Sequence, residues 1–223
     1  MANYIVDPAV LAPYIPAKTE LDVYNGKVYV SLIGFMFENT RLLGFKIPFH
    51  VNFEEVNLRF YVRHSDNGNW KRGVVFIKEI VPRAAISFVA NTLYNEQYST
   101  MQMKHFYEEA AGKIKLGYHW KHRHKWNFIE AITENKLMPI LPGSEAEFIT
   151  EHYWGYSKYN EQRTVEYAVQ HPRWQMYPVK EYTIDCDFTA LYGDRFSMLQ
   201  SATPNSLFVA KGSPISILHK KNL

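Results

Sequence analysis

A ladder of polar side chains alternates with apolar ones along residues 53–63, FEEVNLRFYVR. In a β-strand, successive side chains point to opposite sides, so the apolar side chains would share one face. The other face then carries the residues whose types could do chemistry, which are Glu55, Asn57, Arg59, Tyr61 and Arg63. An arginine guanidinium suits a carboxylate ligand, and a neighbouring glutamate can orient it or act as an acid or base. The same ladder is equally typical of a solvated sheet face, so both interpretations stay open here.

Residues 118–126, YHWKHRHKW, bring three histidines close together in sequence, as a metal site would. On a single strand, His119 lies opposite His122 and His124, whereas zinc usually takes three or four protein ligands. We therefore predict no metal here. The other face of this strand is a basic stripe, which consists of Lys113, Lys115, Lys121, Arg123 and Lys125. A solvated face is the favoured interpretation of the basic stripe, and a surface that binds nucleic acid or protein is the alternative.

Several common chemistries have no motif in this chain. It contains no G-x-S-x-G elbow, no P-loop and no G-x-G-x-x-G, which argues against those routes to nucleophilic catalysis and nucleotide binding. Cys186 lies between Asp185 and Asp187, whose charges disfavour a thiolate. No cofactor is predicted. With a single cysteine, no disulfide can form within the chain, so a reducing, cytoplasmic setting is the simplest expectation.

The composition is that of a globular protein of modest positive charge. The chain has 223 residues, which we predict to form one domain over 1–223, with a net charge of +3. This charge permits an acidic ligand but does not demand nucleic acid, and no nucleic-acid partner is predicted. The first residues lack the basic start and apolar run of a signal peptide, and no segment is apolar enough to span a bilayer. We expect a cytoplasmic protein without a membrane partner.

Alternation of apolar and polar residues dominates the chain, and helical periodicity is scarce. We predict strands over 26–44, 56–62, 72–81, 98–109, 112–129 and 163–172, and a C-terminal hairpin over 205–219 that turns at 211–213. Residues 83–95 show helical spacing, and Ser144 with Glu147 forms a capping box that predicts a second short helix. The fold class is mainly β with a few short helices, as a closed or nearly closed antiparallel barrel that encloses a cavity.

Five separated stretches of this chain resemble the YqjF-like family of bacterial proteins, in the family's order. They are HVNFEEVNLRFYVR (50–63), VPRAAISFVANTLYNEQY (81–98), FITEHYWGY (148–156), VEYAVQHPRW (165–174) and FTALYGDRFSML with PNSLFVAKGSPISIL (188–218). That family is similar in fold to acetoacetate decarboxylase. The resemblance implies an antiparallel β barrel or cone with a central cavity, and it favours inward residues on the ladder.

The decarboxylase chemistry does not carry over with the fold. The decarboxylases use a lysine Schiff base, and we place the corresponding segment near residues 93–103, which contain no lysine. The nearest lysine, Lys104, is followed by His105 rather than by a second lysine. A fold can be kept while its chemistry changes. The resemblance therefore implies this fold without the lysine chemistry.

The motifs also select a set of residues for a site. Glu55 and His50 are the candidate catalytic residues, and the predicted ligand-binding residues are Arg59, Glu55, Asn57, Tyr61, Arg83, Tyr94, Tyr98 and Tyr156. The leading prediction is a protein that binds a small organic molecule, either a carboxylate or a polar metabolite, in a β-barrel cavity. The alternatives are a lyase or isomerase that uses Glu55 with a tyrosine or histidine, an interaction module built on the basic stripe, and a homo-oligomer formed through edge strands.

Overall fold

Strands account for most of the chain in the computed structural model, which describes residues 1–41 and 50–223 and only the backbone of Tyr94 and His219. The strands are β1 (Ala2–Val6), β2 (Glu20–Leu21), β3 (Val28–Phe37), β4 (Phe53–Asp66), β5 (Asn69–Val81), β6 (Tyr98–Thr100), β7 (Gln102–Ala110), β8 (Lys113–His122), β9 (Lys125–Glu134), β10 (Met138–Pro139), β11 (Trp154–Lys158), β12 (Thr164–Gln170), β13 (Gln175–Asp185), β14 (Ser206–Ala210) and β15 (Ser216–Asn222). The helices are α1 (Pro8–Leu11), α2 (Ala84–Tyr94), α3 (Glu145–Thr150) and α4 (Phe188–Tyr192), with 3-10 turns η1 (Ala12–Tyr14) and η2 (Asp194–Gln200). The prediction of a mainly β protein with a few short helices is confirmed.

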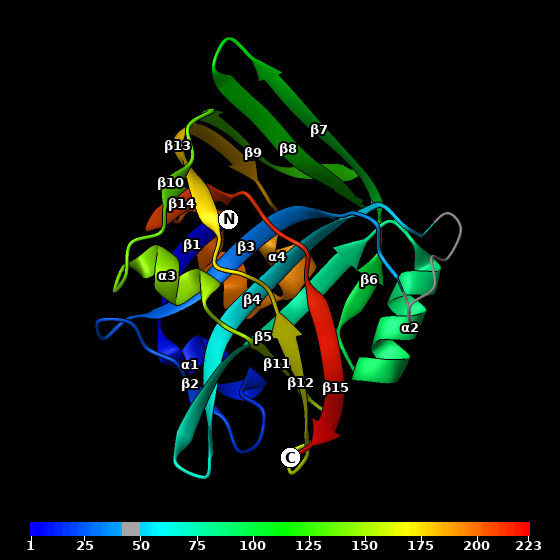
Figure 1. Ribbon diagram of the computed structural model, residues 1–223. Helices are drawn as coiled ribbons and strands as arrows, with labels where there is room; N and C mark the ends of the chain where they lie inside the picture. Colours follow the sequence, from blue (N-terminus) through cyan, green and yellow to red (C-terminus); the bar gives the residue numbers. More distant parts are fainter. Residues whose placement is uncertain (42–49) are drawn as a thin grey trace.

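The strands join into one strongly curved sheet (Figure 1). Its order is β15-β12-β11-β5-β4-β3-β1-β14-β13-β9-β8-β7, and the short strands β10, β2 and β6 pair with β13, β4 and β5. Among the described residues β15 and β7 are the two ends of this path, so the barrel is open rather than closed. Most neighbours are antiparallel, but β11 and β6 both run parallel to β5, which a purely antiparallel sheet would not contain.

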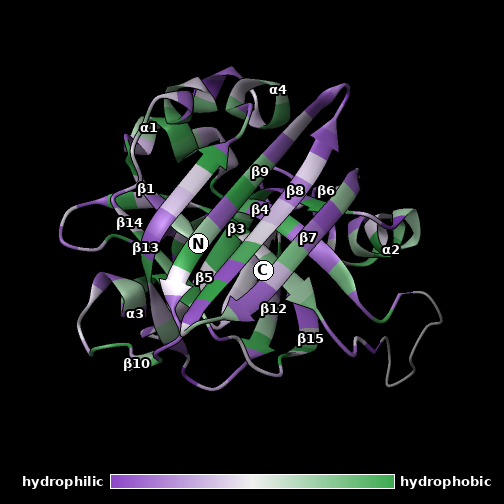
Figure 2. Ribbon diagram, turned by 90° about the horizontal axis from the view of Figure 1, so that it is seen from above, coloured by the Kyte–Doolittle hydropathy of each residue, from purple (hydrophilic) through white to green (hydrophobic). Residues whose placement is uncertain are grey.

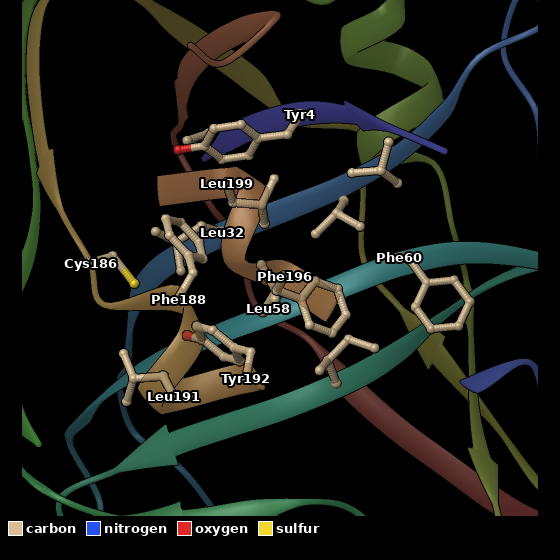
Figure 3. Packing of buried hydrophobic residues seen from close by; sticks show 14 of the residues in the cluster. Tyr4, Leu32, Leu58, Phe60, Cys186, Phe188, Leu191, Tyr192, Phe196 and Leu199 are labelled. Atoms are coloured by element: carbon tan, nitrogen blue, oxygen red, sulfur yellow. The ribbon is translucent and has the colours of Figure 1, made fainter. Parts of the chain in front are cut away.

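The core lies against the apolar face of β4. Val56, Leu58, Phe60 and Val62 are all fully buried, as their alternation predicts. They pack under the side chains that α4 and η2 bring down onto β3, β4 and β5, namely Phe188, Leu191, Tyr192, Phe196 and Leu199 (Figure 3). The side chain of Asp187 accepts a hydrogen bond from the Ala190 amide at 3.0 Å and so caps α4. Gly193, with a φ of 95°, then turns the chain from α4 into η2.

Two short helices begin where their sequence signals place them. The Ser144 hydroxyl accepts a hydrogen bond from the Glu147 amide at 3.2 Å, so the capping signature of α3 is confirmed. Helix α2 spans nearly all of the predicted 83–95, but its apolar stripe is not covered, because Phe88 is 71% exposed. Within the described residues, no helix has both the length and the apolar composition needed to cross a bilayer.

Two strand predictions are wrong, the first because a short turn was not recognised and the second because two neighbouring strands pair with distant partners. The stretch 112–129 is two strands, because Arg123 and His124 form the turn between β8 and β9. His122 and His124 therefore do not share a strand face. The stretch 205–219 is not a hairpin, since β14 pairs with β1 and β13 whereas β15 pairs with β12. The predicted strand 26–44 contains β3, and its residues 42–44 lie outside the described residues.

We expect the β4 core to dominate stability. Replacing Phe60, which is fully buried, by Ala should lower the free energy of unfolding by about 3–5 kcal/mol, because the cavity left by the ring adds to the lost burial. Phe88→Ala on the exposed face of α2 is the matched control and should change it by less than about 0.5 kcal/mol. Urea unfolding followed by circular dichroism measures both, and equal losses in the two variants would contradict this assignment of the core.

Candidate functional site

The polar ladder of β4 is also buried, on the face opposite the core. Glu55 is 1% exposed, Asn57 1% and Tyr61 1%, and Arg59 is half-buried. Arg63, near the end of the strand, is also partly exposed, and it pairs with Glu20 at 2.6 Å. The interpretation of the ladder as a solvated face is therefore wrong for these inner residues. Strand β4 is covered on both sides, and its second side is polar.

Neighbouring strands add further acids to this face. Asn57 of β4 lies beside Glu79 of β5, which lies beside Tyr98 of β6, so the three residues form a row across the sheet. Glu79 is 2% exposed, and Glu96, just before β6, is 7% exposed. We call these residues the carboxyl cluster: Glu55, Glu79 and Glu96 with Asn57, Tyr98 and Tyr167. Three acids in one buried region are costly unless their charge is neutralised.

Hydrogen bonds hold the carboxyl cluster together. The Asn57 amide donates to Glu55 Oε1 at 2.9 Å, and the Tyr98 hydroxyl donates to Glu55 Oε2 at 2.9 Å. The Tyr167 hydroxyl donates to Glu96 Oε1 at 2.7 Å. Tyr167 reaches Glu96 by lying directly over Gly155 of β11, where an added Cβ would come within 2.1 Å of the Tyr167 ring. A glycine at position 155 is thus needed to let β12 contribute its tyrosine.

The pKa values of the three acids are all shifted towards the neutral form. Burial raises the pKa of Glu55 to about 7, although the hydrogen bonds from Asn57 and Tyr98 and the charge of Arg59 oppose this rise. Burial likewise raises the pKa of Glu96 to about 8. Burial, and then the nearby Glu96 and Glu55, raise the pKa of Glu79 well above its usual range. The cluster therefore keeps protons at a pH where exposed glutamates are ionised.

Three polar atoms on this face have no hydrogen-bond partner among the described residues: Asn57 Oδ1, Glu79 Oε2 and Arg59 Nε. Arg59 Nη2 makes only a long contact of 3.5 Å with the carbonyl oxygen of Ile149. The Arg59 guanidinium also lies 5.6 Å from the centre of the Tyr61 ring. Buried polar atoms normally have partners, so these three atoms on two adjacent strands are candidate contacts for a polar ligand.

The remaining predicted residues lie outside the carboxyl cluster. Tyr61 belongs to a hydrogen-bonded chain in which its hydroxyl meets Ser31 Oγ at 2.7 Å and Ser31 donates to Asn3 Oδ1 at 2.6 Å. Tyr156 is buried and donates to Glu166 Oε2 at 3.1 Å, outside the carboxyl cluster. Arg83 is exposed just before α2, and His50 is half-buried three residues before β4. The side chain of Tyr94 lies outside the described residues.

Glu79 and Glu96 were not singled out by the sequence. Glu79 follows Lys78 in the run VVFIKEIV, and a charged residue in such an otherwise apolar strand is a signal of a buried polar site. Nothing in the sequence pairs Glu96 with Tyr167, because that contact joins segments far apart in the chain.

A second buried polar group lies near Arg59. His152 Nε2 is 3.1 Å from Asp22 Oδ2, and Arg72 Nε donates to the same oxygen at 2.6 Å. The imidazole packs between the rings of Tyr61 and Phe148, with centroid distances of 4.7 and 5.2 Å. Burial lowers the pKa of His152 to about 4, so this imidazole is neutral at neutral pH. We assign this group a structural role that holds α3 and its following segment against β4.

The basic stripe does not form one continuous face. Lys113 and Lys115 are exposed on β8, whereas Lys125 begins β9 and pairs with Asp185 at 2.8 Å. Lys121 lies 6.0 Å from the centre of the Trp126 ring. His119 pairs with Glu130 at 2.9 Å. In the part of the chain that the structure describes, no group of three or more histidine, cysteine or acidic side chains is arranged to hold a metal ion.

The carboxyl cluster should make stability depend on pH. Because the pKa of Glu96 is raised to about 8 in the folded state, the folded protein binds more protons than the unfolded chain above pH about 4.5, and stability falls as the pH rises towards about 8. Glu96→Gln keeps the shape without the titration, so it should remove at least about 1 kcal/mol of this loss between about pH 5 and 8. Urea unfolding at several pH values measures the slope, with the exposed Glu161→Gln as control. An unchanged slope in Glu96→Gln would contradict the assignment.

Comparison with known proteins agrees with this architecture. Residues 1–214 match DUF2071, a family described as uncharacterized conserved proteins. The uncharacterized protein YqjF of Bacillus subtilis (strain 168) is 29% identical over 178 residues, which cover 77% of this chain and 69% of YqjF.

Two solved structures share the fold at low identity. The enduracididine biosynthesis enzyme MppR in complex with pyruvate has 12% identity and a TM-score of 0.60 over 94% of this chain and 80% of its own. Acetoacetate decarboxylase of Legionella pneumophila has 14% identity and a TM-score of 0.57 over 97% and 79%. The chain therefore belongs to the DUF2071 family, and it has the acetoacetate decarboxylase-like fold.

Proposed function

We propose that the protein binds a small organic acid with one carboxylate, at the face of β4 formed by Arg59 and the carboxyl cluster. The observation that carries this proposal is the unsatisfied Arg59: its Nε is buried without an acceptor among the described residues. A ligand carboxylate would supply two oxygens in the geometry that a guanidinium fork prefers. The same ligand would give Asn57 Oδ1 and Glu79 Oε2 a partner if it also carried a donor, or would accept a hydrogen bond from the protonated carboxyl group of Glu79.

The protonation of the carboxyl cluster explains how acids and an anionic ligand share one region. Ionised glutamates would repel a carboxylate, but the raised pKa values of Glu55, Glu79 and Glu96 keep the cluster largely neutral near pH 7. A neutral carboxyl group can donate a hydrogen bond to a carbonyl oxygen. A second carboxylate on the same ligand would lie beside the glutamates of the carboxyl cluster, where no second cation would pair with it. The arrangement thus favours monocarboxylates with a carbonyl or hydroxyl group over dicarboxylates.

The structural comparison supports this choice of ligand class. The likeness to MppR shows a shared fold, and pyruvate, which is bound in that MppR structure, is a monocarboxylate with a neighbouring carbonyl group. We carry only that chemical class to this chain. The proposal also places the protein in the cytoplasm, where its buried Cys186 stays a free thiol.

An enzyme that moves a proton at the same place is the second candidate. Glu55 has a pKa of about 7 and accepts a hydrogen bond from Tyr98, and a carboxyl that titrates near neutral pH is suited to general acid and base chemistry. Such a lyase or isomerase would use the same Arg59 for recognition. An enzyme of this kind would exchange the C3 protons of a bound 2-oxo acid, which lie next to the carbonyl group, with deuterium from solvent. NMR measures this exchange and distinguishes the enzyme from a protein that only binds.

Arg59→Ala should abolish ligand binding with little other change. A compound that binds only the folded protein raises the melting temperature as its concentration increases, so we expect pyruvate to raise it in the wild type and to have no effect in Arg59→Ala. Arg63→Ala is the matched control, because Arg63 lies on the same face of β4 but pairs with Glu20 near solvent. It should keep the full response.

The dicarboxylate succinate provides the test of charge selectivity in the same assay. A response to succinate as large as that to pyruvate would contradict the role of the neutral carboxyl cluster. A response to pyruvate that survives in Arg59→Ala would overturn the proposed site itself.

No lysine Schiff base should form with a 2-oxo acid. Lys78 has its pKa lowered by burial, but it lies on the opposite face of the sheet and donates to the carbonyl oxygen of Leu191. Lys104 lies over the Trp126 ring, 4.7 Å from its centre, on an exposed strand. Treatment with pyruvate and borohydride, followed by intact-mass spectrometry, should therefore leave the mass unchanged. A stable adduct mapped to a lysine would contradict this prediction.

A further inference from the structure

Strand β7 forms one end of the sheet and has no strand on its outer side among the described residues. Together with β8 it extends away from the rest of the molecule, at the top of Figure 1. An edge strand presents a row of backbone amide and carbonyl groups that another chain can pair with. We propose that two copies of this chain associate through β7, antiparallel and related by a two-fold axis at Phe106. This association is independent of the proposed ligand.

The side chains of β7 are complementary to themselves in one register. With Phe106 opposite Phe106 of the second copy, all nine residues of Gln102–Ala110 are paired. Lys104 then lies opposite Glu108 of the second copy, and Glu108 lies opposite its Lys104. Opposite charges across antiparallel strands are stabilising. Both side chains are exposed in one copy, where Lys104 lies 4.7 Å from the centre of the Trp126 ring.

Other registers lose these pairs or oppose like charges. A shift of two residues places Lys104 opposite Phe106 or Ala110 of the second copy, and a shift of four places Lys104 opposite Lys104 or Glu108 opposite Glu108. Like charges directly across a strand pair are destabilising. A shift of one residue places side chains from opposite faces of the sheet across from one another, so the alternation of the strand excludes it. The charge pattern therefore selects the register in which the strand is fully paired.

Aromatic residues add contact area at the centre of this pairing. Tyr107 is 58% exposed, and in the proposed register it lies opposite His105 of the second copy. His105 is already oriented by Glu54, whose Oε1 is 2.7 Å from its Nδ1. Seen from above, β7, β8 and β9 lie side by side and alternate between hydrophilic and hydrophobic residues (Figure 2). Pairing at β7 would extend this part of the sheet into the second copy.

The other end of the sheet lacks this complementarity. Strand β15 carries Lys220 and Lys221 and no acidic residue between Ser216 and Asn222. Lys221 is also engaged within the chain, at 3.2 Å from Glu166 Oε1. Lysines on an edge strand are a common device against edge pairing. The two edges thus differ in chemistry, and only β7 matches a second copy of itself.

Charge reversal across β7 is the test. Size-exclusion chromatography with light scattering should show a dimer for the wild type, and Lys104→Glu or Glu108→Lys should each raise the dimer dissociation constant about tenfold, because each creates two like-charged pairs. The double variant Lys104→Glu with Glu108→Lys restores both pairs in reversed order and should dimerise again. Lys136→Glu, an exposed charge reversal in the loop after β9, should leave the dimer unchanged. Circular dichroism confirms that each variant is folded.

A cysteine on the proposed axis gives an independent measurement. Cys186 is buried, so Phe106→Cys introduces the one accessible thiol among the described residues. Paired residues of adjacent antiparallel strands lie close enough for a disulfide, so mild oxidation should cross-link this variant into a covalent dimer, whereas Tyr182→Cys on exposed β13 should stay uncross-linked. A monomeric wild type, single variants that dimerise like the wild type, or a double variant that stays monomeric would each overturn the proposal.

Discussion

The burial of β4 on both faces is the constraint on which the rest of the structure depends. Its apolar face meets α4 and η2, and its polar face meets the carboxyl cluster and α3. A strand buried on both sides can keep polar residues only if their hydrogen bonds are satisfied or their charges neutralised. This requirement accounts for the tyrosines supplied by β6 and β12 and for the raised pKa values of the glutamates. Helices α3 and α4 lie against opposite faces of this strand.

The alternation of residues 53–63 predicted the two faces of β4 correctly, because alternation reports directly on which side chains share a side. It did not predict what covers each face, since that depends on segments distant in sequence, such as α4 and β12. The glycine at position 155 illustrates the limit: its role is clear only when Tyr167 is seen to lie over it. Local signals such as the Ser144 cap were sufficient, because capping involves residues three positions apart.

The two wrong strand predictions have different causes. Arg123 adopts a positive φ of 55° in the turn between β8 and β9, a conformation for which glycine or asparagine is the usual signal. The prediction of a single strand through this turn placed His122 and His124 on one face, which they do not share. The C-terminal segment has the glycine of a hairpin turn, yet its two strands pair with distant partners. Turn residues thus mark where a chain bends but not which strands it joins.

The position of β1 has a consequence for how the chain folds. This first strand lies between β3 and β14, so its sheet pairing joins opposite ends of the sequence. A side-chain relay from Asn3 through Ser206 to Glu145 reinforces the same junction. Contacts between residues so far apart close large loops, which slows folding. During synthesis β1 must wait for β14 to emerge, so one of its edges stays open to wrong partners until residues 206–210 have been made.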